Sequence, residues 1–461
     1  MKILLFNFFK VKSSILIYRD HFYHWLVSNL PEDKIDVKFL MNEKQYNENV
    51  EQKVINDSPI ECLTYNDINY IFQQDLTFEE IFQKIHFNDY TINDKKRLKE
   101  VFENKFGDWI PDIIVGLGYF STKLIWNDIF PKALCLTQEN AIFSRDPFTR
   151  TLSYEPYNHL LETFLNKYKN DILKIQISQN ESNKLKNFRK DLSFIIDKNS
   201  KIKNKIKIKK RKFKYLVLLP LSYGIKFCKE YIYGNDLELI DYVLSNVSND
   251  IGIIVTQHEG NPVLNAENIK YFSNKYPNFI YLGENNSLLY YKYVDAVFCA
   301  VSKVNTMALL YDKPVISLAK TYNDWLKDGQ GIEDLEKILT QPKKDKNNIL
   351  YWYLTHYIIF EKDFYKENFL YDYLRNKLEK YRKDGINFEF FDKINDIDDI
   401  TKYTIDTVKE YYKKIEQEKR EVYILKMKHY ITQLKQYFMQ KIMCIKSLLS
   451  AIIRIMRLYI C

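Results

Sequence analysis

The sequence has few of the features that would place it in several common classes of protein. Its six cysteines are scattered, with no Cys-x-x-Cys pair and no spacing suited to a metal ion, which argues against a disulfide framework or a zinc module and fits a reducing cytoplasm. No uncharged apolar run reaches the roughly eighteen residues that a transmembrane helix needs. The apolar start, MKILLFNFF, is not followed by a small-residue cleavage site and reads as a first β-strand.

Glycine and proline are also scarce, at 11 residues each among 461, whereas Tyr, Phe, Asn, Lys and Ile are abundant. This bias is typical of an AT-rich coding sequence and carries no functional information. The length excludes one small domain and suffices for two domains with full cores and an appendage. The net charge of +9 is modest, but the excess lysine and arginine is concentrated at 201–214 and in the last forty residues.

The second half alternates apolar runs of strand length with amphipathic helical stretches. The predicted strands are KYLVLLPL (214–221), IGIIVTQ (251–257), FIYLG (279–283), DAVFCAV (295–301) and KPVISLA (313–319). Continuous Val/Ile/Leu runs are typical of strands buried on both faces, and helical connections of this length require parallel pairing. The pattern predicts an open α/β sheet of Rossmann type.

The first half repeats this pattern less clearly. Its strand candidates are MKILLFNFF, IDVKFLM, IECLTY, PDIIVGLG (111–118) and KALCLTQEN (132–140). We therefore expect a bilobed protein with a cleft at the carboxyl ends of both sheets. The predicted boundaries are an acceptor domain at 1–205, a nucleotide-sugar domain at 206–385 and a helical segment at 386–461. The aromatic helical stretch after 350 is expected to cross back to the first lobe, with His356 packed inside it.

The C-terminal segment differs in kind from the two halves. In KIMCIKSLLSAIIRIMRLYIC, apolar residues recur at helical spacing while Lys and Arg interrupt the run. A basic amphipathic helix lying in an anionic membrane surface fits this pattern. Packing against the protein itself, or a coiled coil, remains the alternative.

The basic run KIKNKIKIKKRKFK at 201–214 is the one feature that would suit nucleic acid. Because it leads directly into a strand and lies where two lobes must be joined, we interpret it as a solvated linker or a second membrane-facing patch. No nucleic-acid partner is expected.

Polar residues follow two strands of the second half. His258 comes directly after the strand at 251–257, with Glu259 beside it, and an imidazole there can donate to a phosphate oxygen. The strand at 295–301 runs into Ser302, Lys303, Asn305 and Thr306 before the stretch TMALLY, for which Ser302 is a plausible N-cap. A structural role, as a core histidine or a simple helix cap, is the alternative for these residues.

The series PLS, TQHEGNP, PNFIYLG and VDAVFCAVSKVNTMALLYDKPVISL resembles the nucleotide-binding domain of bacterial glycosyltransferases of GT-B architecture, and more narrowly the Kdo transferases of capsule and lipopolysaccharide synthesis. The resemblance implies two Rossmann-like domains. It also implies that His258 and Ser302 hold the cytidine monophosphate part of CMP-Kdo.

The first half resembles the same family in LCLTQENAIFSRDPF (134–148). There the resemblance implies that Glu139, preceded by Gln138, acts as a general acid or base on the acceptor hydroxyl, or as a nucleophile. Arg145 and Asp146 follow in the same loop, where Arg145 suits a carboxylate or a phosphate, or pairs with Asp146.

Three positions depart from the family pattern. Glu259 stands where relatives have Pro, and Lys303 stands in place of a second Ser. No Asp follows LPLSYGIKF where retaining relatives carry a carboxylate, the nearest acids being Glu230 and Asp236.

The leading hypothesis is a glycosyltransferase that moves a sugar, such as Kdo from CMP-Kdo, to a cell-surface glycan or lipid-linked acceptor. It would use no metal and no cofactor apart from the nucleotide-sugar substrate, and it would lie on the inner face of the cytoplasmic membrane. The alternatives are the same fold with a UDP- or GDP-sugar donor and a non-catalytic surface-polysaccharide assembly protein.

Overall fold

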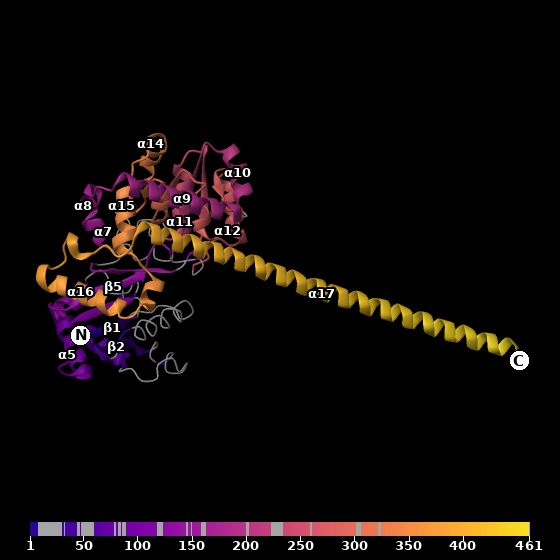
Figure 1. The fold of residues 1–461 in the computed structure, drawn as a ribbon, viewed down its shortest axis with the longest axis horizontal. Coiled ribbons are helices and arrows are strands. Elements are labelled where there is room, and N and C mark those ends of the chain that lie inside the picture. The colour runs from indigo at the N-terminus through magenta and orange to yellow at the C-terminus, as the bar shows by residue number, and fades with distance from the viewer. Residues whose placement is uncertain are drawn as a thin grey trace. The chain divides into compact units, whose positions relative to one another are not determined.

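The protein is described by a computed structural model that forms two compact units, residues 1–405 and 406–461. The described residues are 1–7, 30–31, 33–43, 47, 60–77, 80–81, 84, 89–117, 123–143, 146–148, 150–157, 163–199, 202–222, 234–258, 261–300, 306–320 and 324–460. The first unit holds two β-sheets with their helices (Figure 1).

The first sheet has seven strands in the order β13-β6-β5-β4-β1-β2-β3. Its strands are β1 (Lys2–Asn7), β2 (Asp36–Asn42), β3 (Ile60–Leu63), β4 (Ile113–Leu117), β5 (Leu134–Asn140), β6 (Thr151–Glu155) and β13 (Ile359–Phe360). β1 to β5 pair in parallel in the Rossmann order 3-2-1-4-5. All five predicted strands of the first half are therefore present.

The edge formed by β6 and β13 was not predicted. β6 pairs antiparallel with β5 because the ten residues between them are too few for a helical crossover. β13 pairs antiparallel with β6, although some two hundred residues separate them, so the chain returns to the first sheet after completing the second. This confirms the predicted return of the late segment to the first lobe.

The second sheet has six strands in the order β12-β11-β10-β7-β8-β9. They are β7 (Tyr215–Pro220), β8 (Ile251–Thr256), β9 (Phe279–Ile280), β10 (Ala296–Cys299), β11 (Val315–Ser317) and β12 (Gly329–Gln330). Every pair is parallel, and the order is the Rossmann order 3-2-1-4-5-6. The order reverses between β7 and β10, which makes this pair the switch point of the sheet.

Local signals in the sequence explain where several helices begin. Thr64 and Thr91 form capping boxes with Asp67 and Asp94, and Asn235 accepts two backbone N–H groups at the start of another helix. The α-helices of the first unit are α3 (Tyr65–Phe72), α5 (Ile92–Phe106), α6 (Lys123–Ile129), α7 (Phe164–Lys167), α8 (Lys169–Lys174), α9 (Gln179–Asn199), α10 (Lys203–Lys212), α11 (Asp236–Asn246), α12 (Ala266–Lys275), α13 (Met307–Leu310), α14 (Leu335–Thr340), α15 (Asn347–Trp352) and α16 (Phe369–Asp384).

Short 3₁₀ turns and one π-helical turn complete the first unit. They are η3 (Ser287–Leu289), η5 (Asp324–Leu326), η6 (Ile332–Asp334), η8 (Glu361–Tyr365), η9 (Phe388–Phe390) and the π-helical turn η7 (Tyr353–Tyr357). His356 lies in η7 with its ring stacked on Trp352 at 5.5 Å, as predicted for a packing residue.

The basic run between the two sheets forms a helix rather than an extended linker. In α10, Ile206 is buried together with Ile202 one turn before it, whereas the Ile208 side chain is 65% exposed. Because Ile202 and Ile206 share one helical face, the lysines project from the remaining faces. The four basic residues of its last turn also suit the negative end of the helix dipole.

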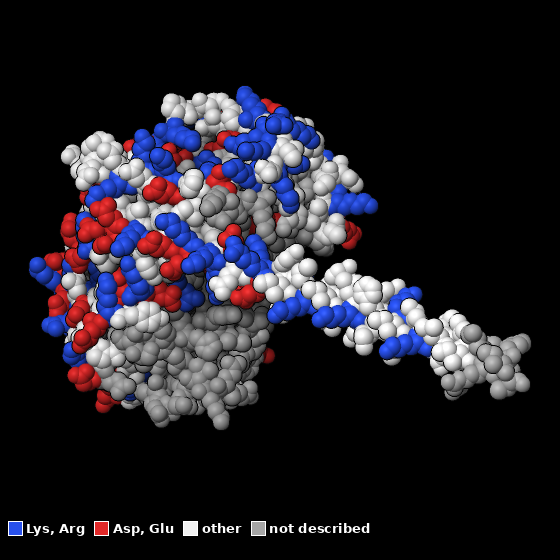
Figure 2. Space-filling model, turned by 45° about the vertical axis from the view of Figure 1, so that its right-hand side comes forward, with Lys and Arg blue, Asp and Glu red and all other residues white. Residues whose placement is uncertain are grey.

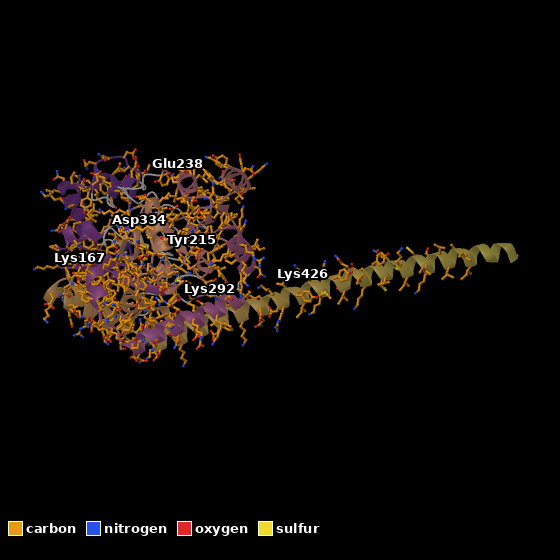
Figure 3. All side chains as sticks on the ribbon, turned by 90° about the horizontal axis from the view of Figure 1, so that it is seen from above. Lys167, Tyr215, Glu238, Lys292, Asp334 and Lys426 are labelled. Carbon is orange, nitrogen blue, oxygen red and sulfur yellow. The ribbon has the colours of Figure 1, made fainter. Side chains whose placement is uncertain are left out.

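The second unit is the C-terminal part of one continuous helix, α17 (Ile397–Ile460), which confirms the predicted helical segment (Figure 1). Its side chains, Lys426 among them, project along its length (Figure 3). Among the described helices, none combines the length and the apolar content needed to cross a bilayer.

Candidate functional site

The carboxyl ends of the central strands of the second sheet lie level with one another. Pro220 at the end of β7 pairs with Thr256 at the end of β8, and Val297 of β10 pairs with Leu218 of β7. The residues that follow these strands therefore meet at one edge, next to the switch point where open α/β sheets bind ligands. The same edge carries His258, two residues beyond β8.

Hydrogen bonds fix the turn that carries His258. The Asn261 N–H donates to the His258 carbonyl at 2.9 Å, and the Gln257 side chain accepts the Leu264 N–H at 2.7 Å. Gln257 is buried, whereas His258 is half-buried and can reach a ligand at the edge. The half-buried imidazole on a braced turn fits the predicted role in donor binding.

A buried carboxyl group lies under this turn. Asp236 is the first residue of α11 and only 5% exposed, and its Oδ2 accepts the Asn261 side-chain amide at 2.7 Å. Burial raises the pKa of Asp236 to about 7, against the opposing effect of the Asn261 hydrogen bond. Asp236 thus supports the His258 turn through Asn261 with a group that changes charge near neutral pH.

The sequence named Asp236 only as one of the nearest acids after the first strand. It is the residue after the N-cap Asn235, so its pattern is that of an ordinary helix start. Its proximity to the His258 turn depends on the pairing of β7 with β8, which no local signal encodes.

Thr306 lies at the start of α13, beyond the end of β10, and is buried. α13 is a single turn, and its last carbonyls are held from outside by Arg189 of α9. The guanidinium of Arg189 donates to the carbonyls of Leu309 at 3.0 Å and Leu310 at 3.1 Å. Because one turn cannot hold its own shape, these contacts set where Thr306 lies.

The N-cap of α13 is Thr306, so the interpretation of Ser302 as the N-cap of this helix is wrong. The helix is shorter than TMALLY because Lys313 and Pro314 lead at once into β11. One turn offers a weaker anion site than a full helix would, since fewer aligned peptide dipoles contribute.

Glu139 lies near the end of β5 and is 5% exposed. Its Oε1 accepts the N–H of Asn140 at 3.1 Å, and it pairs with Ser153 across the antiparallel edge. Gln138 precedes it on the opposite face and is buried, and its amide has no hydrogen-bond partner among the described residues. Asp146, further along the same loop, is exposed.

Two contacts join the loop after β5 to the second sheet. The backbone of Ile142, three residues after Glu139, and the side chain of Thr306 both hydrogen-bond to the hydroxyl of Tyr353. The Asn286 amide of the second lobe donates to the Asp146 carbonyl at 3.2 Å. The loop after Glu139 and the start of α13 are therefore neighbours across the two lobes.

The remaining predicted residues, Arg145, Glu259, Ser302, Lys303 and Asn305, lie outside the described part of the chain. Their site roles stay predictions. Among the described residues, no group of three or more His, Cys, Asp or Glu side chains is arranged to hold a metal ion.

The fold defines a protein of two Rossmann-like domains, the GT-B architecture, followed by a helical segment. Neither a protein-family model nor a curated protein matches the sequence. The chain is similar to the solved UDP-GlcNAc 2-epimerase of Methanocaldococcus jannaschii in complex with UDP-GlcNAc and UDP, at 15% identity over 76% of this chain and 95% of that one, with a TM-score of 0.33.

Two further solved structures are similar at the same level. The KpsC β-Kdo 2,7-transferase of Thermosulfurimonas dismutans is 13% identical over 62% of this chain and 90% of its own, with a TM-score of 0.34. The MnaA–UDP structure from S. aureus is 12% identical over 86% of this chain and 99% of its own, with a TM-score of 0.32. At these values the fold assignment rests on the strand order and pairing of this chain itself.

Proposed function

We propose that the protein is a glycosyltransferase that binds a nucleotide-sugar at the carboxyl edge of the second sheet and an acceptor glycan or glycolipid beside the first. The observation that carries this proposal is the proximity of two strand-end loops from different Rossmann-like sheets. One follows Glu139 and the other leads to Thr306, and both hydrogen-bond to Tyr353. An acid and a donor-binding edge on facing lobes are what transfer between two bound substrates requires.

Each residue takes a role that its chemistry allows. Glu139 accepts the proton of the acceptor hydroxyl as that oxygen attacks the anomeric carbon. His258 donates a hydrogen bond to the donor phosphate, so that negative charge on the leaving nucleotide is stabilised as it develops. Thr306, with Ser302, Lys303 and Asn305 before it, contacts the same nucleotide, and Gln138, Arg145, Asp146 and Glu259 line the acceptor and sugar positions.

The finer assignment is a CMP-Kdo donor used in capsule or lipopolysaccharide synthesis. Its support is the sequence resemblance at TQHEGNP and at the segment from DAVFCAV to KPVISL. The nucleotide-sugar is a substrate, and no resident cofactor or metal is proposed.

We also propose that α17 binds the inner face of the cytoplasmic membrane. After Glu421 the sequence has no acidic residue up to its last position, but it has seven basic ones: Lys426, Lys428, Lys435, Lys441, Lys446, Arg454 and Arg457. Figure 2 shows blue and white side chains, without red, on this part of the helix. Such charge suits an anionic lipid surface.

The apolar residues of α17 recur at helical spacing and are exposed. Their exposed fractions range from 38 to 66% for Ile424, Met427, Ile431, Leu434, Phe438, Ile445, Leu448 and Ile452. A coiled coil would cover the same face, but its flanking positions need oppositely charged partners, and a segment without acids cannot supply them to a second copy. An interfacial helix needs none.

Calorimetry with the full-length protein tests the catalytic proposal. CMP, UDP, GDP and CDP are titrated into the wild type, His258→Ala and Glu139→Gln, with His429→Ala, an exposed histidine of α17, as the matched control. We expect CMP to bind the wild type and the control, to bind His258→Ala at least tenfold more weakly, and to bind Glu139→Gln normally.

Transfer activity separates the two residues. With the donor that binds, Glu139→Gln should lose transfer by about 10²-fold or more, because the proton acceptor is absent. Binding of UDP or GDP alone would change the donor and keep the class of enzyme. Binding of none of the four nucleotides would contradict the proposal and favour a non-catalytic assembly protein.

A further inference from the structure

The start of α13 depends on contacts made by other parts of the chain. α13 (Met307–Leu310) is one turn long, and the side chain of its N-cap Thr306 makes no capping bond to the helix backbone. The Thr306 side chain instead hydrogen-bonds to the Tyr353 hydroxyl. A single turn gains little stability from its own hydrogen bonds, so its placement follows from this contact and from Arg189 at its other end.

The loop after Glu139 is held in a similar way. The N–H of Ala141 donates to the Thr151 carbonyl at 2.8 Å, and the N–H of Phe143 donates to the Thr151 hydroxyl at 3.0 Å. Both bonds tie the loop to its own sheet. The backbone of Ile142, between these two residues, bonds to the Tyr353 hydroxyl. This is the loop's link to the other lobe through Tyr353.

Tyr353 is itself rigidly placed. It begins the π-helical turn η7, is 3% exposed, and its ring stacks on Trp325 of the second lobe at 5.5 Å. Four residues later, the Tyr357 hydroxyl donates to Glu155 of β6 in the first sheet at 2.5 Å. Burial raises the pKa of Tyr353, so the hydroxyl stays protonated and hydrogen-bonded throughout the neutral pH range. π-Helical turns are rare and are often found at functional sites.

We infer that Tyr353 is a positioning residue that sets the distance between the loop after Glu139 and the start of α13 through one hydroxyl group shared by both. The inference rests on the proposed function in one respect, that these loops serve acceptor and donor. The coupling itself is a property of the fold. A shift of about 1 Å between reacting groups can lower turnover by about 10²-fold, so the hydroxyl matters for rate more than for substrate affinity.

The test compares Tyr353→Phe with Tyr357→Phe in the full-length protein. Both variants remove one buried hydroxyl from the same π-helical turn and keep the ring. Tyr357 bonds only within the first sheet, where Glu155 retains the N–H groups of Tyr157 and Phe164. The control therefore reports the general cost of losing a buried hydroxyl.

The first readout is amide hydrogen exchange at Ile142, measured by mass spectrometry with fragmentation. We expect at least tenfold faster exchange at Ile142 in Tyr353→Phe than in Tyr357→Phe at matched global stability, because the amide loses its acceptor. This readout does not depend on any activity. Equal exchange in the two variants would overturn the inference even if the protein is a glycosyltransferase.

The second readout is steady-state transfer. We expect kcat to fall at least tenfold in Tyr353→Phe relative to Tyr357→Phe, with the KM for the donor changed less than threefold. Faster exchange at Ile142 without a selective fall in kcat would overturn the positioning role. A wild type that neither binds a nucleotide nor transfers a sugar contradicts the proposed function, and the exchange measurement then decides the coupling alone.

Discussion

Asp236 shows how one buried carboxyl group makes stability depend on pH. Its folded pKa is raised by burial to about 7, from an ordinary value of 3.8. The folded state therefore binds this proton more tightly than the unfolded state does. The favourable contribution is complete below the unfolded pKa and is lost as the pH rises through about 7.

We predict that Asp236→Asn removes this dependence. Relative to the wild type, the variant should gain free energy of unfolding between pH 5 and pH 8, on the order of a few kcal/mol. Urea denaturation of both proteins at the two pH values measures the difference. A gap between wild type and variant that stays constant with pH would contradict a raised pKa.

Asp241 on the same helix is the matched control, because its pKa shifts the other way. The Lys275 side chain, 2.7 Å from its Oδ1, lowers the pKa of Asp241. The stability that Asp241 contributes is therefore present above its unfolded pKa and is lost as the pH falls through the folded one. Asp241→Asn should accordingly show no gain in stability from pH 5 to pH 8.

At the scale of elements, the strands were predictable and the short connections were not. The apolar runs of β1, β4, β7 and β8 are buried on both faces, so the sequence pattern alone identifies them. β6 reads TLSYE, with two hydroxyl residues and an acid, and β13 has only two residues. Their pairing is set by the return of the chain, and local propensity carries no record of it.

The candidate site divides in the same way. Glu139 and His258 end apolar strands, so their position at a sheet edge follows from the sequence. Asp236 and Tyr353 matter through contacts with residues that are distant along the chain, Asn261 in one case and Ile142 and Thr306 in the other. Tyr353 also stands in the aromatic run WYLTHY, where nothing distinguishes it from its neighbours.

The placement of α13 gives a prediction at this scale. Arg189→Met should lower the free energy of unfolding by about 2–4 kcal/mol, because two carbonyls and the Asn347 side chain lose a buried charged donor. Lys190→Met, an exposed neighbour on α9, is the control and should change stability by less than about 0.5 kcal/mol. Chemical denaturation checks both, and equal stability of the two variants would rule out the capping role of Arg189.

At the scale of the whole molecule, α17 predicts binding to lipid. Full-length protein should bind vesicles that contain anionic lipid and should bind neutral vesicles poorly. Ile431→Glu with Leu434→Glu should weaken binding at least tenfold, since both residues lie on the exposed apolar face. Vesicle co-sedimentation at physiological salt measures this.

Gln433→Glu with Gln436→Glu is the control for α17, because it adds the same charge on the opposite face. It should weaken binding only by the electrostatic part, roughly 1 kcal/mol per charge. Equal losses in the two double variants would mean that the apolar face does not enter the lipid. Self-association of the wild type without lipid binding would favour a coiled coil instead.

The return of the chain to its first sheet also bears on how the protein is made. Glu155 is fully buried, and one of its hydrogen-bond donors, Tyr357, leaves the ribosome some two hundred residues later. The edge strand β13 is translated just after it. A nascent chain that has completed residues 1–205 thus has an open sheet edge and a carboxylate that still lacks this donor. We therefore expect the amino-terminal lobe to reach its final fold only after most of the second lobe has been synthesised, and genetic dissection of the two lobes must keep the segment around 353–384 with the first.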